Sequence, residues 1–219
     1  MTSRTQLAQL ICTRLCHDLA GPVGAVAAGV ELIGDDPSMV DGETLGLISA
    51  SSAAASKKLK FLRAALGTGA QHSAAALADV EPTVIGFLAA TAPSSGAPTL
   101  KWPAAEALAR LQDATSPAAI QVLLNALLVV LEALPATRDL AVDLLDSSAG
   151  WEIGVRADSE KGVVRQDIIE AVADPERVLP SARNAQALYW VALAQDLSAS
   201  VSLARAENTV TAVVKFERK

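Results

Sequence analysis

Residues 5–34 read TQLAQLICTRLCHDLAGPVGAVAAGVELIG, and this stretch decides the fold of the chain. Apolar residues and one proline recur in it at steps of three and four, namely Leu7, Ile11, Leu15, Leu19, Pro22, Val26, Val30 and Ile33. Such spacing places them along one face of an α-helix. The turn-forming run Gly34-Asp35-Asp36-Pro37 follows directly. We therefore expect one amphipathic helix that ends near residue 34.

A second helix is expected over residues 42–66, where a heptad-like seam runs along the sequence. Its members follow one another at alternating steps of three and four: Leu45, Ile48, Ser52, Ala55, Leu59, Leu62 and Leu66. Two helices joined by a short loop form a hairpin, and one hairpin cannot bury two apolar stripes. A symmetric homodimer that forms a four-helix bundle is the simplest completion.

The small and polar stretch of residues 67–75 separates this hairpin from the rest of the chain, so we expect two domains, residues 1–72 and 73–219. In the second domain we expect helices at 81–91, 117–134 and 183–197, and strands at 98–102, 139–146, 151–157, 199–205 and 209–217. The last strand is the clearest, because Val210, Ala212, Val214 and Phe216 alternate with the residues between them. The predicted fold class is α+β, a helical hairpin followed by an α/β sandwich in which helices cover one sheet.

The composition of the chain excludes several classes of partner. The chain has 219 residues, a net charge of −6 and a pI near 4.9, which gives no basic field for nucleic acid or anionic lipid. No apolar run reaches the roughly 20 residues that span a bilayer. Residues 1–9 lack the pattern of a secretory signal. We expect a cytoplasmic protein that binds neither nucleic acid nor a membrane.

His17 is the residue on which the predicted chemistry depends. It lies two positions from Leu15 and Leu19 of the buried stripe, so at about 100° per residue its side chain faces solvent. The residues on its own face are Thr13, Arg14, Ala20, Gly21, Gly24 and Ala28, and all of them except Arg14 are small. We predict that five of these, Arg14, Ala20, Gly21, Gly24 and Ala28, form a flat docking strip for another protein.

Asp18 and Pro22 suggest what His17 does. A neutral imidazole is a good nucleophile for phosphorus, and a neighbouring carboxylate can fix its tautomer and take up a proton. Pro22 has no N–H, so the carbonyl of Asp18 loses its helical partner and the helix tends to bend. A surface histidine beside a surface aspartate, without chemistry, fits these residues equally well. A zinc site of Cys12, Cys16 and His17 is disfavoured, because consecutive helical residues point about 100° apart; we expect the two cysteines to be reduced packing residues.

The run His17-Asp18-Leu19-x-x-Pro22 resembles the H-box of dimerising sensor histidine kinases, with the phosphoacceptor histidine at 17 and the acid at 18. The stretch from Arg14 to Ala25, with Gly29-Val30-Glu31-Leu32, resembles more narrowly the ChpT family of histidine phosphotransferases, and a weaker similarity covers nearly the whole chain. This resemblance implies a dimeric hairpin that carries the histidine and a second domain similar to a kinase ATP-binding domain that no longer works as one. It also implies two kinds of partner: the receiver domain of a hybrid histidine kinase, and receiver domains of response regulators that control the bacterial cell cycle. The receiver would bring the Mg²⁺.

The second domain departs from the kinase pattern where a nucleotide would bind. Residues 121–129 resemble the N-box helix and keep its first asparagine, Asn125, but the second is Val129. Residues 157–162 lack an Asp-x-Gly-x-Gly turn, and residues 181–188 lack the glycines that would let the backbone approach phosphates. We therefore expect no cofactor and no metal bound by this chain, and a structural hydrogen bond for Asn125.

These observations predict a histidine phosphotransferase that moves a phosphoryl group from a hybrid kinase receiver aspartate to His17 and on to a response regulator aspartate. An ATP-dependent histidine kinase and a non-catalytic pseudokinase scaffold that binds receivers remain as alternatives. Four basic residues on the outer face of the second helix are either solvated or contacts for an acidic receiver surface: Lys57, Lys58, Lys60 and Arg63. His72 is expected to be exposed, and Trp102, Trp151 and Trp190 to pack in or near the core.

Overall fold

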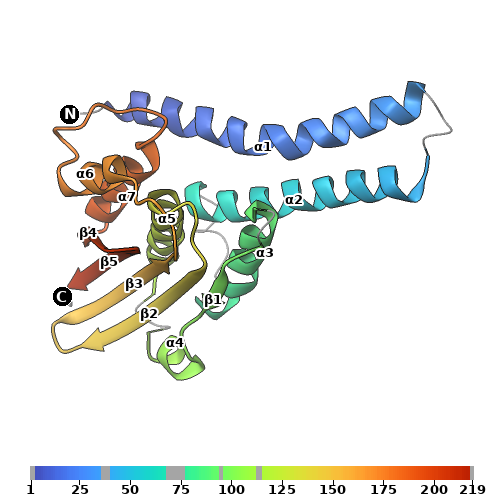
Figure 1. Cartoon of the computed structure of the whole chain (residues 1–219). Helices are drawn as coiled ribbons and strands as arrows, with labels where there is room; N and C mark the ends of the chain where they lie inside the picture. Colours follow the sequence, from blue (N-terminus) through green and yellow to red (C-terminus); the bar gives the residue numbers. More distant parts are fainter. Residues whose placement is uncertain (1–2, 36–39, 68–76, 94–95, 112–114, 218–219) are drawn as a thin grey trace.

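A long helical hairpin and a smaller α/β unit make up the computed structural model, which describes residues 3–35, 40–67, 77–93, 96–111 and 115–217. The hairpin consists of α1 (Arg4–Asp35) and α2 (Gly42–Leu66), close to the two predicted helices. Its outer end projects well beyond the α/β unit, while its inner end packs against that unit (Figure 1). His72 and the predicted domain boundary at residues 72 and 73 lie outside the described residues.

Local chemistry accounts for the course of the two long helices. The side chain of Asp41 accepts a hydrogen bond of 2.7 Å from the backbone N–H of Thr44, which caps α2. Pro22 lies inside α1, and Figure 1 shows a shallow bend in the middle of that helix. Gly29 is required for close approach of the helices, since a Cβ there would lie 2.5 Å from Cγ1 of Ile48. No described helix is long and apolar enough to cross a membrane.

The α/β unit is built on one mixed sheet. Within the described residues its strands are β1 (Thr99–Lys101), β2 (Asp139–Ser147), β3 (Gly150–Asp158), β4 (Ser200–Ala206) and β5 (Thr209–Glu217), in the spatial order β1-β2-β3-β5-β4. The β1–β2 pair is parallel and the other pairs are antiparallel. Val210, Ala212 and Val214 of β5 are fully buried, as their alternation predicts. One face of the sheet therefore carries the core.

Helices cover that face of the sheet (Figure 1). They are α5 (Pro117–Ala133), α6 (Gln166–Ala173) and α7 (Ala185–Asp196), while α3 (Glu81–Thr91) packs against α2 and α4 (Ala105–Leu111) lies near β2. A short 3-10 helix, η3 (Leu77–Asp79), precedes α3. The mixed α+β fold is confirmed. The helices α4, α6 and η3 were not predicted from the sequence, because a helix of about two turns or less shows too few periods to be recognised.

The hairpin and the α/β unit share one hydrophobic core. Phe61, Leu62 and Ala65 at the end of α2 are almost completely buried among residues of α3 and α5. The ring of Phe61 stacks on that of Phe87, with centroids 4.0 Å apart. Leu7 and Leu15 of α1 pack against the same core. The inner half of the hairpin is thereby fixed to the α/β unit.

Asn125 joins three helices inside this core. Its amide nitrogen donates to the carbonyls of Ala65 in α2 and Gln121 in α5, both at 2.7 Å, and its oxygen accepts from Nε2 of Gln186 in α7 at 2.5 Å. The side chain is completely buried. The predicted structural role of Asn125 is confirmed by these contacts.

The predicted seam of α2 is only half covered within one chain. Leu62 is buried, but Leu45 and Leu59 are 48% and 47% exposed. On α1, Val30 of the predicted stripe is 57% exposed. The contacts within a single hairpin therefore leave part of both apolar stripes open to solvent.

The hydrogen bonds of Asn125 lead to a test of the joint between the helices. Asn125→Ala leaves the Ala65 carbonyl and the Gln186 amide without this partner in the core, and each such group costs about 1–3 kcal/mol. The free energy of unfolding, measured by urea titration with circular dichroism, should fall by about 2 kcal/mol or more. The control is Asn208→Ala, which removes an exposed amide that donates to the Glu160 carbonyl and should change stability by no more than about 0.5 kcal/mol. Equal losses of unfolding free energy in the two variants would contradict the role of Asn125 in linking α2, α5 and α7.

Candidate functional site

His17 stands in the middle of α1 with its side chain 89% exposed, as the helical phase predicts. Its Nδ1 atom lies 3.7 Å from Oδ1 of Asp18. In the tautomer with its proton on Nδ1, that N–H faces the carboxylate. Nε2 then carries the lone pair and is the nucleophilic atom of the ring. This arrangement is the one that an imidazole nucleophile needs.

The surface around His17 is open and nearly featureless. Thr13, Ala20, Gly21, Gly24 and Ala28 are all exposed, and a Cβ on Gly21 or Gly24 would meet no atom within 4 Å. Four of the five residues of the predicted strip, Ala20, Gly21, Gly24 and Ala28, are therefore exposed as expected. Its role as a docking surface stays a prediction.

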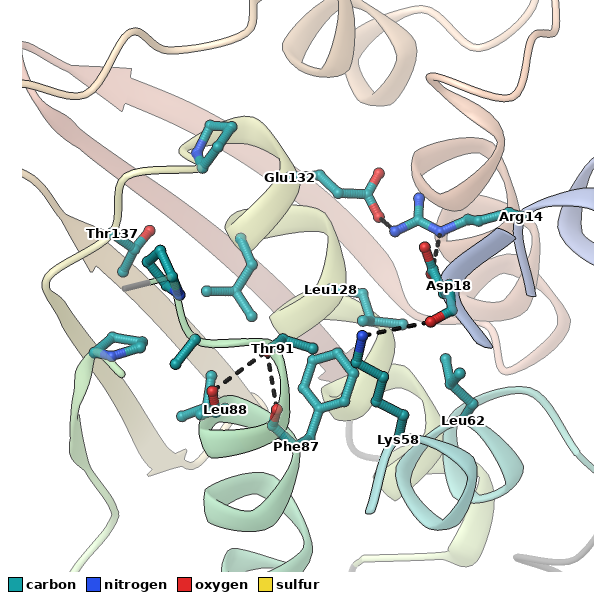
Figure 2. Close-up of a pocket in the computed structure, with 15 residues that line it drawn as sticks. Arg14, Asp18, Lys58, Leu62, Phe87, Leu88, Thr91, Leu128, Glu132 and Thr137 are labelled. Carbon is teal, nitrogen blue, oxygen red and sulfur yellow. Dashed lines mark hydrogen bonds and ion pairs between the residues drawn. The ribbon is translucent and has the colours of Figure 1, made fainter. Parts of the chain in front are cut away.

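Arg14 differs from the other residues of the predicted docking strip, because its side chain is only 19% exposed. Its Nε atom lies 3.6 Å from Oδ2 of Asp18, and its Nη2 atom forms an ion pair with Oε1 of Glu132 in α5. Figure 2 shows the guanidinium lying between these two carboxylates. The charge of Arg14 is thus paired with carboxylates of the same chain and is not available on the surface of the strip.

Glu132 is a carboxylate in an apolar setting. Its side chain is 13% exposed, and burial raises its pKa, while the neighbouring Arg14 opposes that rise. Glu132 was not among the site residues predicted from the sequence. A signal for it was present, since Glu132 is the one charged residue in helix 117–133, whose other residues are apolar or neutral.

Lys58 contacts the backbone of Asp18. Its Nζ atom donates to the Asp18 carbonyl at 3.4 Å, the carbonyl that Pro22 leaves without a helical donor. The prediction that Lys58 lies on the outer face of α2 is wrong, because its side chain is half-buried and points toward α1 (Figure 2). Lys57, Lys60 and Arg63 are exposed, as predicted.

A cavity of about 260 Å³ lies beside these charged groups, between the hairpin and the α/β unit. Arg14, Asp18, Lys58 and Glu132 line one side of it (Figure 2). The rest of its lining is mainly apolar, from α2, α3, α5 and the segments next to β1 and β2: Leu62, Phe87, Leu88, Thr91, Ala92, Pro93, Pro98, Leu128, Leu131, Pro135 and Thr137.

The remaining predicted residues are placed as follows. Cys12 and Cys16 are free and exposed, so the prediction that they pack inside is wrong for the single chain. In the described part of the chain, no three or more His, Cys, Asp or Glu residues gather as a metal site would require. Trp190 and Trp151 are buried and Trp102 is half-buried, as predicted, and Trp190 donates to the Val122 carbonyl at 3.1 Å.

Known proteins are similar to this chain in sequence and in fold. The family model described as the histidine phosphotransferase C-terminal domain matches residues 98–209, about half of the chain. A curated relative, the protein phosphotransferase ChpT of Brucella abortus, is 28% identical over 212 residues, which cover 95% of each chain. Among solved structures, a bacterial phosphotransferase superposes with a TM-score of 0.74 at 24% identity, over 98% of both chains. A looser likeness, with a TM-score of 0.48 at 13% identity, is to the histidine kinase AdeS of Acinetobacter baumannii, over 92% of this chain and 97% of that chain.

The family match lies in the α/β unit, while the exposed imidazole lies outside it on the hairpin. The relative from Brucella spans both parts, since the shared sequence covers nearly the whole chain. The chain belongs to the ChpT-type family of histidine phosphotransferases.

Proposed function

We propose that this protein is a phosphorelay intermediate that takes a phosphoryl group from the receiver aspartate of a hybrid histidine kinase onto His17 and passes it to the aspartate of a response regulator. The observation that carries the proposal is the exposed His17 imidazole, whose Nδ1 faces Asp18 on an open strip of small residues. Family membership and the name of the Brucella relative support the same reaction class. The proposal places the reaction in the cytoplasm.

The main group that this chain has to supply for the reaction is a positioned nucleophile. Nε2 of His17 forms a bond to phosphorus as the bond between phosphorus and the receiver carboxylate oxygen breaks, and the carboxylate leaves. The ring gains positive charge, which the negative charge of Asp18, with its Oδ1 atom 3.7 Å from Nδ1, offsets. In the second step a response regulator carboxylate attacks the phosphorus and the Nε2–phosphorus bond breaks. A Mg²⁺ ion that would neutralise phosphoryl charge would be held by the receiver rather than by this chain.

The docking strip suits this reaction because alignment dominates phosphoryl transfer. Ala20, Gly21, Gly24 and Ala28 carry no side chain beyond a methyl group, so a receiver can bring its aspartate close to α1 along the exposed face. Arg14 is the exception in the predicted strip, because its charge is taken up by Asp18 and Glu132.

The α/β unit offers a poor fit to the ATP that kinase-like domains hold. Asn125, the one candidate magnesium ligand on the resembling helix, uses its amide for Ala65, Gln121 and Gln186. Asp158 lies in the stretch 157–162, which lacks the Asp-x-Gly-x-Gly turn of a nucleotide site. Its carboxylate accepts a hydrogen bond from Oγ1 of Thr209 at 2.6 Å and pairs with Arg156 at 3.0 Å. No step of the proposed mechanism therefore passes through a nucleotide.

The proposal includes a homodimer built through the hairpin. Exposed apolar residues recur at whole heptads on both helices: Val23 and Val30 are seven positions apart on α1, and Leu45 and Leu59 are fourteen positions apart on α2. A stripe with this repeat on each of two antiparallel helices suits a second copy of the same hairpin. The resulting four-helix bundle would leave the strip around His17 on the outside.

The assignment of His17 is tested by His17→Gln. Because the side chain is exposed, folding stability should change by no more than about 0.5 kcal/mol. Acid-labile phosphate, supplied by a labelled and phosphorylated receiver domain, should no longer appear on the protein. His72→Gln is the control and should accept phosphate like the unmodified chain. Label retained in His17→Gln would refute the assignment.

The docking strip is tested by Gly24→Leu. Leucine is a better helix former than glycine by roughly 0.8 kcal/mol, and the position is open, so the melting temperature should hold or rise. A partner backbone held away by about 1 Å can cost a hundredfold in rate, so exchange with receivers should slow strongly. Gly46→Leu, at another open helical glycine near the far end of the hairpin, should leave exchange unchanged. Exchange at the unmodified rate in Gly24→Leu would place the receiver elsewhere.

The homodimer is tested by light scattering and by Leu59→Ala. The unmodified chain should show a dimer mass at micromolar concentration, and the substitution should raise the dissociation constant at least about tenfold, equivalent to about 1.4 kcal/mol. Leu145→Ala, at an exposed leucine of β2 outside the stripe, should leave the constant unchanged. A monomer mass for the unmodified chain would contradict the four-helix bundle.

A further inference from the structure

Glu132 is a buried charge that the proposed transfer does not use. It sits in α5, in the last turns of a helix whose other residues are apolar or neutral, and its side chain is 13% exposed. Placing a carboxylate there is unfavourable unless a cation accompanies it. Arg14 reaches across from α1 and provides that cation.

A connected series of charged groups runs from Glu132 to the imidazole. Nη2 of Arg14 pairs with Glu132, Nε of Arg14 lies 3.6 Å from Oδ2 of Asp18, and Oδ1 of Asp18 lies 3.7 Å from Nδ1 of His17. The two oxygens of Asp18 thus face two different groups, and Figure 2 shows Arg14 between the two carboxylates. Fixing the Arg14 guanidinium limits how the Asp18 carboxylate can turn.

The backbone at Asp18 is held from a different side. Lys58 of α2 donates to the carbonyl that Pro22 deprives of its helical partner. The main chain of Asp18 is therefore held by α2, and its side chain is connected through Arg14 to the α/β unit. Asp18 is 37% exposed, so without these ties its carboxylate could rotate into water.

We propose that Glu132 is a positioning residue for phosphoryl transfer: from the α/β unit it holds Arg14 against Asp18, which sets the Asp18 carboxylate on Nδ1 of His17 and leaves Nε2 as the attacking atom. This inference rests on the proposed function of His17. It also gives the α/β unit a part in the reaction that needs no nucleotide. Removing one partner of a buried ion pair leaves the other charge unpaired and lowers stability, so the readouts are taken at a temperature where circular dichroism shows each variant to be folded.

The test uses Glu132→Gln in a His72→Gln background, so that His17 is the remaining histidine. The matched control is Glu152→Gln, which makes the same change in the α/β unit at a carboxylate paired with Lys215 on the sheet. The first readout is the His17 tautomer from imidazole ¹⁵N chemical shifts. The second is the rate at which phosphoramidate, a small phosphoryl donor, forms phosphohistidine as its phosphorus–nitrogen bond breaks and ammonia leaves.

Glu132→Gln should lower the fraction of the Nδ1–H tautomer and slow phosphohistidine formation between about tenfold and a hundredfold. Glu152→Gln should change neither quantity. Arg14→Gln should reproduce the Glu132→Gln result, and adding Glu132→Gln to it should have no further effect, because the influence of Glu132 passes through Arg14.

Three results would overturn the inference. One is an unchanged tautomer and rate in Glu132→Gln. Another is additive losses in the double variant. Should Glu132→Gln fail to fold, Arg14→Gln decides, and an unchanged tautomer and rate in that variant would overturn it as well. Failure of the proposed function is distinguishable, since it would appear as a chain that accepts phosphate from phosphoramidate but not from any receiver.

Discussion

The packing of the last turns of α2 against α3 and α5 is the contact on which the rest of the structure depends. Phe61, Leu62 and Ala65 enter the same core as the sheet, and the Asn125 side chain links the end of α2 to α5 and α7 within it. Because buried side chains interdigitate at high density, the inner half of the hairpin cannot shift relative to the α/β unit without opening that core. Because α1 packs on α2, this contact also brings Arg14 of α1 within reach of Glu132 in α5.

This arrangement combines an exposed nucleophile with a buried support. His17 must be reached by two different partner proteins, so it stands on an open face with small neighbours. An exposed imidazole has no packing to orient it, and orientation has to come from groups beneath it. Asp18, Arg14 and Lys58 occupy that position, partly shielded from water, where electrostatic interactions are stronger than at the surface.

The sequence predicted regular structure well where one pattern repeats many times. It did not predict the contacts that join segments far apart in the sequence. Both long helices and the alternating strand β5 follow from many repeats of one pattern, whereas the short helices α4 and α6 offer too few. The exposure of His17 follows from its place relative to Leu15 and Leu19. The pairing of Arg14 with Glu132 and the inward course of Lys58 do not, because they depend on how α1, α2 and α5 pack together. The sequence did mark Glu132 as the one charge in a helix of apolar and neutral residues, without indicating which cation would pair with it.

The most direct test of the central claim is the site of phosphate on the protein after incubation with a phosphorylated receiver. A correlation spectrum between ³¹P and the imidazole protons of the phosphorylated chain identifies both the residue and the ring nitrogen. The account predicts phosphorus on Nε2 of His17, the atom that Asp18 leaves uncovered. Phosphorus on Nδ1, on a different residue, or absent from the protein altogether would contradict it.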